Sequence, residues 1–483
     1  MTMQSRGEFL RGMAGAGLLA GLGGFKAAFA AEEAGALLKM GVISDVHLNS
    51  NPGSEATLRT ALEYFRDRGV EAVLVAGDIA DAGRRQELQL FADTWFRVFP
   101  DDKAPDGHHV ERLIVYGNHC MDGWRWNKYM RESAEAAARD GLGYAPSRAR
   151  IWEEVFHEEF KPIWMKTVKG IPVIGAHWET RETNPNGIAI ESFMAAHGRE
   201  IDPRMPFIYV QHAHPKDTCM GAWAWGHDDG RATRALSPFP NAIAFSGHSH
   251  YSLTDERSVW QGAFTSINAA SLSYASFDYS LRENASGNSF GYRGESRPHR
   301  MSNIGRCRSG HGMLVSVFAD HLAIERRSFI YDDLLGDDWI VPLPAANGTY
   351  SYAKRAAKRL APEFAAGAKV TVAVTPKKDE KDEKDFTHVT LTFPAAQPRG
   401  GCRVNEYEVT AVLCEDDVEL VQAQRRMMSP DHHRPLSSLV KDVSFVFAAE
   451  DLPLKGSYRF EVRPVECFGK KGAPLASEQV KIV

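Results

Sequence analysis

The chain has 483 residues, of which 43% are hydrophobic and 25% are charged, and its formal net charge is -5. Such a composition is typical of a soluble globular protein, and the length predicts two or three domains. Because the net charge is small, it argues neither for a nucleic-acid binder nor for a protein of membrane surfaces.

Residues 1–30 have the features of an export signal. A basic head with Arg6 and Arg11 precedes a short apolar stretch, and Ala28-Phe29-Ala30 forms a small-x-small cleavage site. The head resembles a twin-arginine signal with Gly7 in place of the second arginine, so the choice between the twin-arginine and the general route stays open. We expect an exported protein, periplasmic or extracellular, with no transmembrane segment after signal removal.

Five short apolar stretches each end on an acid, an amide or an imidazole. Short continuous apolar runs are typical of central parallel strands that helices cover on both faces. Because the carboxyl ends of such strands meet at one edge of a sheet, the polar residues there should converge, and clustered imidazoles and carboxylates indicate a metal site. The stretches are GVISDVH at 41–47, AVLVAGD at 72–78, LIVYGNH at 113–119, FIYVQH at 207–212 and IAFSGHSH at 243–250.

Helical periodicity separates the first three of these stretches. Apolar residues share one face over 54–69 and again over 85–96, which predicts two consecutive βαβ units and a parallel central sheet. Later strands are expected near 171–176 and 265, and a hairpin over 314–330. The expected fold class is therefore α/β, with one sheet or two stacked sheets flanked by helices.

The pattern changes towards the C-terminus. From Ala368 onwards apolar and polar residues alternate, which predicts six or more strands without helices and a small β-sandwich of about 115 residues. We therefore expect an α/β domain over 36–335, a linker or bracing segment over 336–365 and an all-β sandwich over 366–483.

The five polar strand ends, in this order, resemble the calcineurin-like metallophosphoesterase superfamily over roughly residues 38 to 335. The resemblance implies a four-layer fold of mixed sheets between helices. It also implies a dinuclear metal-dependent phosphoesterase that hydrolyses a phosphomonoester or phosphodiester by attack of a metal-bridged hydroxide. By resemblance Asp78 bridges the cations, while Asp45, His47 and His250 complete the first metal and Asn118, His212 and His248 complete the second.

Spacing and residue type agree with this assignment. Residues two apart, such as Asp45 and His47, point the same way on a strand, so both members of a pair can face the site. The resemblance gives His119 the task of stabilising or protonating the leaving group, and it makes Asp81 the residue that orients His119. Relatives with a purple iron centre carry a tyrosine ligand shortly after the aspartate that matches Asp78. The residues that follow Asp78 here begin with Ile79 and include no tyrosine at that place, so manganese, iron and zinc all stay open.

Several other residues are candidates for substrate binding, and structural packing is an equally acceptable explanation for most of them. Aromatic and imidazole side chains there could form a wall for an apolar leaving group. His432 and His433, by contrast, are expected at the surface. The substrate candidates are His177, His214, Trp223, Trp225 and His227.

The six cysteines include no CxxC pair, so buried free thiols are the favoured interpretation, although a bridge is compatible with export. The segment 458–472 gives the C-terminal sandwich a resemblance to a fibronectin type III-like module. We expect this sandwich to pack on the catalytic domain or to present it to a partner.

Three alternatives stay open at this point. The first is an exported nucleotide or cyclic-nucleotide phosphodiesterase, and the second is a pyrophosphatase. The third belongs to another class, a non-catalytic binding or scaffold protein on the same fold. The expected partner is a small-molecule or polymeric phosphate ester, with no specific nucleic-acid binding implied, and the sequence does not fix the oligomeric state.

Overall fold

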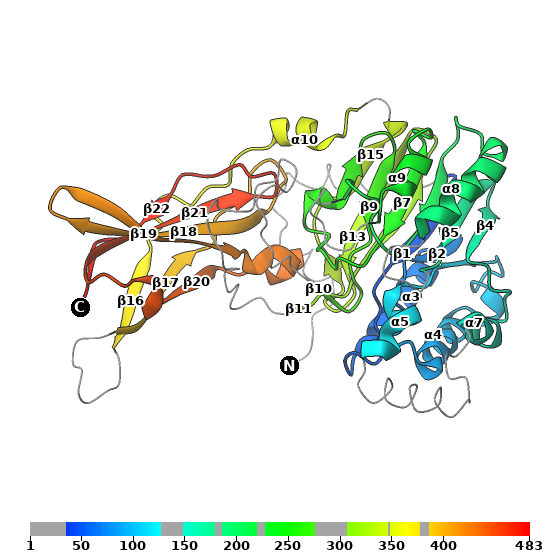
Figure 1. The fold of residues 1–483 in the computed structure, drawn as a ribbon, viewed down its shortest axis with the longest axis horizontal. Helices are drawn as coiled ribbons and strands as arrows, with labels where there is room; N and C mark the ends of the chain where they lie inside the picture. The colour runs from blue at the N-terminus through cyan, green and yellow to red at the C-terminus, as the bar shows by residue number, and fades with distance from the viewer. Residues whose placement is uncertain are drawn as a thin grey trace, which may run out of the picture.

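The computed structural model describes residues 35–126, 148–178, 186–219, 228–275, 307–345, 348–376 and 386–483. Figure 1 shows an α/β part on one side and a strand-rich C-terminal part on the other. The predicted export signal lies outside the described residues. Among the residues that are described, no helix is both long enough and apolar enough to cross a membrane.

The first sheet is mixed. Its parallel part consists of β1 (Leu38–Ile43), β2 (Ala72–Val75) and β3 (Glu111–Ile114), which confirms the predicted parallel arrangement. On the other side of β1 runs the antiparallel hairpin of β12 (His311–Val317) and β13 (His321–Ser328), also as predicted. The two short strands β14 (Asp333–Leu334) and β15 (Trp339–Pro342) both pair with β13.

The second sheet has a parallel centre with antiparallel edges. Its order is β4 (Ile163–Val168), β5 (Ile171–Ala176), β6 (Phe207–Val210), β7 (Ala242–Ser246), β9 (Thr265–Asn268) and β8 (Val259–Gln261). The two sheets share one core, in which Val42 and Leu74 of the first meet Ile208 and Phe245 of the second. Burial of this shared apolar surface holds the two sheets face to face.

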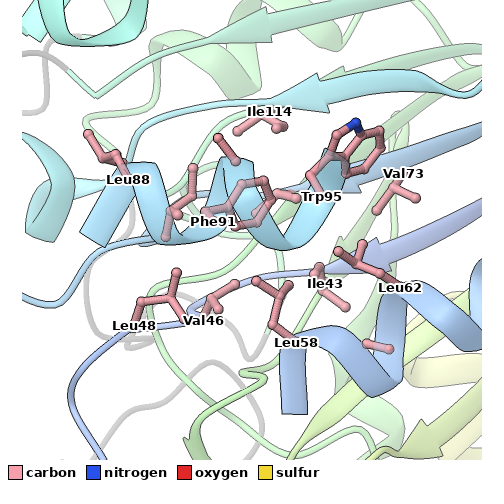
Figure 2. Close-up of a cluster of buried hydrophobic side chains, with 14 of the residues drawn as sticks. Ile43, Val46, Leu48, Leu58, Leu62, Val73, Leu88, Phe91, Trp95 and Ile114 are labelled. Atoms are coloured by element: carbon pink, nitrogen blue, oxygen red, sulfur yellow. The ribbon is translucent and has the colours of Figure 1, made fainter. Parts of the chain in front are cut away.

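Helices cover the outer faces of both sheets. On the first sheet lie α3 (Ser54–Asp67), α4 (Arg85–Val98) and α7 (Arg148–Phe156). Figure 2 shows Leu58 of α3 and Phe91 of α4 over the strand residues Ile43 and Val73. The second sheet is covered by α8 (Asn186–His197) and α9 (Arg231–Leu236). The resulting helix–sheet–sheet–helix layers confirm the predicted fold class.

The C-terminal part is made of two sheets around one core. The three-stranded sheet contains β16 (Thr371–Pro376), β17 (Phe386–Pro394) and β20 (Asp442–Ala448). The other has the order β19 (Val418–Met428), β18 (Val404–Glu415), β21 (Gly456–Glu466) and β22 (Leu475–Ala476), with β23 (Val480–Ile482) also on β21. The strand-rich character is as predicted, while the fibronectin type III-like resemblance stays a prediction.

Direct contacts join the two parts. Helix α10 (Tyr352–Lys358) lies between them in Figure 1, and Arg355 on it donates a hydrogen bond to the carbonyl of Glu256 at 2.6 Å. His311 Nε2 donates to the carbonyl of His433 at 3.1 Å. The expectation that His432 and His433 are surface residues is wrong, because both lie buried where the sandwich packs on the α/β part.

Candidate metal centre

The loops that follow β1 and β2 run side by side beyond the ends of their strands. Asp45 N donates to Gly77 O at 3.0 Å, and His47 N donates to Asp78 O at 2.9 Å. The backbone is left-handed at three of these positions, with φ of 50° at Asp45, 45° at His47 and 48° at Asp78. The expectation that strand alternation aims the Asp45 and His47 pair is therefore wrong, because both residues lie in the loop and reach the site through positive φ.

The loop after β7 repeats this geometry. His248 has φ of 68° and His250 has φ of 57°, again beyond the strand. Each left-handed non-glycine residue costs about 1–2 kcal/mol, so the surrounding contacts must hold it in place. One such contact is the hydrogen bond from His248 N to Asp45 Oδ2 at 2.9 Å. Five of the seven residues that the sequence assigns to metal binding thus have left-handed backbone: Asp45, His47, Asp78, His248 and His250.

The first group of ligand atoms consists of Asp45, His47 and His250. Asp45 Oδ1 lies 2.9 Å from His250 Nε2 and 3.7 Å from His47 Nε2. The two Nε2 atoms lie 3.2 Å apart. Asp45 Oδ1 is buried and makes no hydrogen bond within the described residues. Three side chains therefore direct their donor atoms to one point.

The second group consists of Asp78, His212 and His248. Asn118, at the start of α5 (Asn118–Trp126), directly precedes His119, whose N donates to Asp78 Oδ1 at 2.8 Å. His212 Nε2 lies 3.0 Å from Asp78 Oδ2, and the His212 and His248 ring centroids are 4.9 Å apart. Within the described residues, the buried atoms His212 Nε2 and Asn118 Oδ1 have no hydrogen-bond partner. Asp78 Oδ2 is also 3.8 Å from His47 Nε2 of the first group, so this carboxylate lies between the two groups.

A hydrogen bond at Nδ1 fixes the ring orientation of three imidazoles whose Nε2 atoms face the site. His212 Nδ1 donates to Ala76 O at 2.7 Å, and His250 Nδ1 donates to Tyr274 O at 3.0 Å. His47 Nδ1 donates to the Asp81 carboxylate at 3.1 Å. An imidazole that gives its Nδ1 proton to an oxygen keeps the Nε2 lone pair for a metal. All three Nε2 atoms are thus prepared as ligands.

The charged groups of the site shift one another's pKa values. Burial alone would raise the pKa of Asp45, but the nearby His250 and His212 outweigh it and hold that pKa well below its usual value. Burial would lower the pKa of His47, yet its contacts with the Asp45 and Asp81 carboxylates raise it to about 10. The buried carboxylates thus attract positive charge into this space. Carboxylate, amide and imidazole donors with unsatisfied buried atoms fit two cations of the kind that take N and O ligands.

Three glycines are required by the closeness of the loops. A Cβ at Gly77, where φ is 99°, would lie 2.3 Å from His212 Nδ1. At Gly117 it would lie 2.2 Å from Asp78 Oδ1, and at Gly247 it would lie 1.9 Å from Ser44 Oγ. A side chain at any of these positions would therefore displace a ligand or a residue that supports one.

His119 lies at the edge of the centre with 27% of its side chain exposed. Its Nδ1 donates to the backbone carbonyl of Asp81 at 2.6 Å, whereas the Asp81 carboxylate is 3.8 Å away. That carboxylate accepts its hydrogen bond from His47 instead. Asp81 therefore orients His119 through its main chain and the ligand His47 through its side chain, which differs from the simple acid–imidazole pair expected from the sequence.

The predicted substrate residues fall into two sets. His177 is buried, with its ring 4.8 Å from Trp152 and 4.6 Å from Phe160, and burial lowers its pKa to about 3. His214 is also buried and bonds Ser246 Oγ and Ser249 Oγ, both at 2.7 Å. These two histidines have packing and loop-supporting roles in the structure. Trp223, Trp225 and His227 lie outside the described residues.

Two partly exposed aromatic residues beside the centre were missed as site residues. The Tyr274 ring centroid is 4.3 Å from that of His250, and the Trp178 ring centroid is 5.6 Å from that of His248. Tyr274 thus lies beside the first ligand group and Trp178 beside the second. The place of Trp178, just after a strand that ends on the active edge, could have indicated it; nothing in the sequence indicated Tyr274.

The sequence profile of the calcineurin-like phosphoesterase family matches residues 38–252, from the start of β1 to just past His250. The matched region contains every residue of the two ligand groups. Residues 38–252 form a calcineurin-like phosphoesterase domain. With this domain and its converging ligand atoms, the protein is a metal-dependent phosphoric ester hydrolase.

Solved structures include remote likenesses. A dimetal phosphatase from Danio rerio is 11% identical with a TM-score of 0.37, over 64% of this chain and 99% of that one. A purple acid phosphatase from yellow lupin (Lupinus luteus) seeds is 13% identical with a TM-score of 0.36, over 63% of this chain and 53% of that one. No curated protein matches this chain in sequence.

Proposed function

We propose that the protein hydrolyses a phosphomonoester or phosphodiester at a pair of cations that share Asp78. The observation that carries this proposal is a set of buried atoms that have no hydrogen-bond partner within the described residues, namely Asp45 Oδ1, Asn118 Oδ1 and His212 Nε2. Asp78 Oδ2 lies between the two groups, 3.0 Å from His212 Nε2 and 3.8 Å from His47 Nε2. Asp45, His47 and His250 would hold one cation, and Asn118, His212 and His248 the other.

When bound, the two cations would activate water and neutralise the charge that develops on the phosphoryl oxygens. The protein's own groups complete the arrangement. Asp45 and Asp78 supply negative charge in a buried space, and their outer oxygens are held by His248 N and His119 N. His119 is held through Nδ1, and its imidazolium form would give the Nε2 proton to a leaving oxygen.

A phosphodiester with an aromatic or nucleoside leaving group is a specific second candidate. Tyr274 and Trp178 are partly exposed and lie beside the two ligand groups, where a flat apolar group could stack on either ring. This feature favours a nucleotide or cyclic-nucleotide phosphodiesterase over a pyrophosphatase of lipid or sugar diphosphates, because those substrates carry no aromatic ring to stack on Tyr274 or Trp178.

The donor set supports manganese, iron or zinc. It combines carboxylate, amide and imidazole donors without a thiolate, and Ile79-Ala80-Asp81 follow the bridging residue without a tyrosine. A centre that depends on a tyrosinate ligand for a purple colour is therefore not proposed.

A substrate panel tests the proposed function. The metal-stripped protein is reloaded with Mn²⁺, Fe²⁺ or Zn²⁺ and offered p-nitrophenyl phosphate, its bis-ester, a cyclic nucleotide and a diphosphate. We expect turnover of at least one ester, and faster turnover of aromatic diesters if Tyr274 and Trp178 contact the substrate. Metal binding without turnover of any ester would favour the binding or scaffold alternative, and cleavage of the diphosphate alone would favour the pyrophosphatase.

We also propose that the protein is exported. The support is the basic head, apolar stretch and Ala28-Phe29-Ala30 of its N-terminus. N-terminal sequencing of the mature protein is expected to begin at Ala31, whereas an intact Met1 start in the native host would contradict export.

A further inference from the structure

A second cluster of reactive groups lies in the C-terminal sandwich, apart from the metal centre. Cys402 and Cys467 are both free thiols there, and each residue is only 2% exposed. Their Sγ atoms lie 3.2 Å apart. A disulfide bond is about 2.05 Å long, so the two sulfurs need to approach by only about 1 Å to become bonded.

The pair joins two neighbouring strands at the end of the sandwich that meets the α/β part. Cys402 precedes β18 and Cys467 follows β21, and these antiparallel strands are paired at Val404 and Glu466. Next to Cys402, the guanidinium of Arg403 donates to the carbonyl of Leu335 in the α/β part. A bond between the two sulfurs would therefore close the sandwich at its junction with the catalytic domain.

A metal is the rival explanation, because Glu466 lies beside both thiols. Its Oε2 is 3.4 Å from Cys402 Sγ and 3.9 Å from Cys467 Sγ, while its Oε1 accepts a hydrogen bond from Lys470 N at 2.8 Å. Closed structural zinc sites have four protein ligands, but this group has three within the described residues. Zinc–sulfur bonds of about 2.3 Å in a tetrahedron also hold two sulfurs roughly 3.8 Å apart, which is wider than the distance here.

We propose that Cys402 and Cys467 form a disulfide in the mature protein. The proposed export would supply the oxidising compartment in which the bond forms in the cell, and the geometry of the pair does not depend on it. Each thiol loses a proton and an electron, and one S–S bond forms. The acceptor is a disulfide-bearing oxidant, which takes up the two electrons and two protons and is cleaved to two thiols. The closed loop runs from 402 to 467 and contains most of the sandwich, so the bond restricts the unfolded chain.

Burial determines when the bond can form. Because both cysteines are almost fully buried, an oxidant has to reach their sulfurs before the sandwich finishes packing. Burial also raises the pKa of the Cys467 thiol, so in the folded state it is a poor nucleophile for exchange. Once formed, the bond should resist mild reductants until the protein unfolds.

Peptide mapping of the full-length protein tests the bond directly. The protein is unfolded, refolded in a mixture of reduced and oxidised glutathione, alkylated and digested without reduction, which makes the result independent of export. The expected result is one linked pair of peptides carrying Cys402 and Cys467, about 2 Da lighter than the two thiol forms together. Both cysteines alkylated after this treatment, or a metal ion bound in equal amount to the protein and lost in Cys402→Ser, would overturn the proposal.

Thermal unfolding gives a second readout with a matched control. The oxidised wild-type protein is expected to unfold several degrees higher than the same protein after reduction in denaturant and refolding without oxidant. Cys402→Ser and Cys467→Ser should remove this difference in unfolding temperature between the oxidised and reduced protein. Cys414→Ser should keep it, because the Cys414 thiol on β18 contacts the carbonyl oxygen of Val412 instead of a second thiol. An unchanged redox difference in the first two variants would contradict the assignment.

Discussion

The Nε2 atoms of His47 and His250 lie 3.2 Å apart, although the two residues are separated by most of the catalytic domain in sequence. Both imidazoles give their Nδ1 proton to another group, so each offers a lone pair to the same space. Two facing lone pairs repel unless a proton or a cation lies between them. A cation between the two atoms would relieve this repulsion, so the pair marks a candidate metal position within the described residues.

The position of His119 predicts a role in chemistry rather than in metal binding. His119→Ala should keep both metals and lower kcat by about 10²–10⁴ on an ester with a poor leaving group, with a smaller loss on p-nitrophenyl phosphate, whose leaving group needs no proton. Metal analysis and kcat on the two substrates check this. Loss of metal in the variant, or full activity on the poor leaving group, would contradict the assigned role.

Asp81 is expected to act on the metal through His47. Asp81→Ala removes the carboxylate that accepts from His47 Nδ1, but it leaves the carbonyl that holds His119. Metal affinity should fall about 10- to 100-fold, and Asp81→Asn should restore part of it, because an amide oxygen can still accept that hydrogen bond. Titration of the metal-free variants checks this; unchanged affinity in Asp81→Ala would instead indicate that the side chain serves His119.

Close packing at Gly247 predicts a large effect from one methyl group. A Cβ there would lie 1.9 Å from Ser44 Oγ and 2.2 Å from Asp45 Oδ2. Gly247→Ala should cost about 1–3 kcal/mol of unfolding free energy and reduce metal content. Gly198→Ala is the matched control, because its Cβ would meet Phe239 at an ordinary 3.4 Å. Equal thermal stability and metal content in both variants would show that the loop does not require glycine.

Acid should weaken the packing of the sandwich on the α/β part. Burial lowers the pKa of His311 and His432 to about 3 and that of His433 to about 4. These groups are neutral when folded, whereas unfolded histidine has a pKa of about 6.5, so the unfolded state binds more protons below that pH. The contribution of these histidines to the free energy of unfolding should thus be complete above pH 6.5 and decrease as the pH drops towards 4.

Thermal unfolding across pH 4–8 measures this dependence. Each histidine contributes at most about 1.4 kcal/mol per pH unit in the sensitive range. His433→Gln should flatten the curve between pH 4 and 6.5, and His109→Gln, at an exposed position, should not. A wild-type curve that is flat through this range would show that the buried histidines are protonated without cost.

The convergence of the candidate ligand residues could be predicted because these residues follow a general rule of open α/β sheets. Asp78 and Asn118 each come shortly after a strand whose apolar residues are evident in the sequence, and parallel strands bring their ends to one edge. The order of the layers could be predicted as well, because each amphipathic helix needs a sheet face on which to bury its apolar side. Residue type at these positions then indicated the chemistry.

What sequence reasoning missed depends on contacts between distant segments. Left-handed backbone at Asp45 and His248 stands on residues that are not glycine, so the residue type at these two positions does not predict it. Tyr274 reaches the site because its carbonyl holds His250, and no pattern around it signals this. His432 is buried only because the sandwich packs against the α/β part, where Thr254 donates to its carbonyl.

Metal stoichiometry in Asp78→Ala tests the central claim most directly, since the shared carboxylate defines the centre as dinuclear. Elemental analysis of wild-type protein reconstituted with Mn²⁺ or Zn²⁺ should give two metal ions per chain, and Asp78→Ala should bind neither tightly and lose nearly all phosphoesterase activity. The account is contradicted if Asp78→Ala still binds two ions per chain, or if wild-type protein stripped of metal hydrolyses its esters at the full rate.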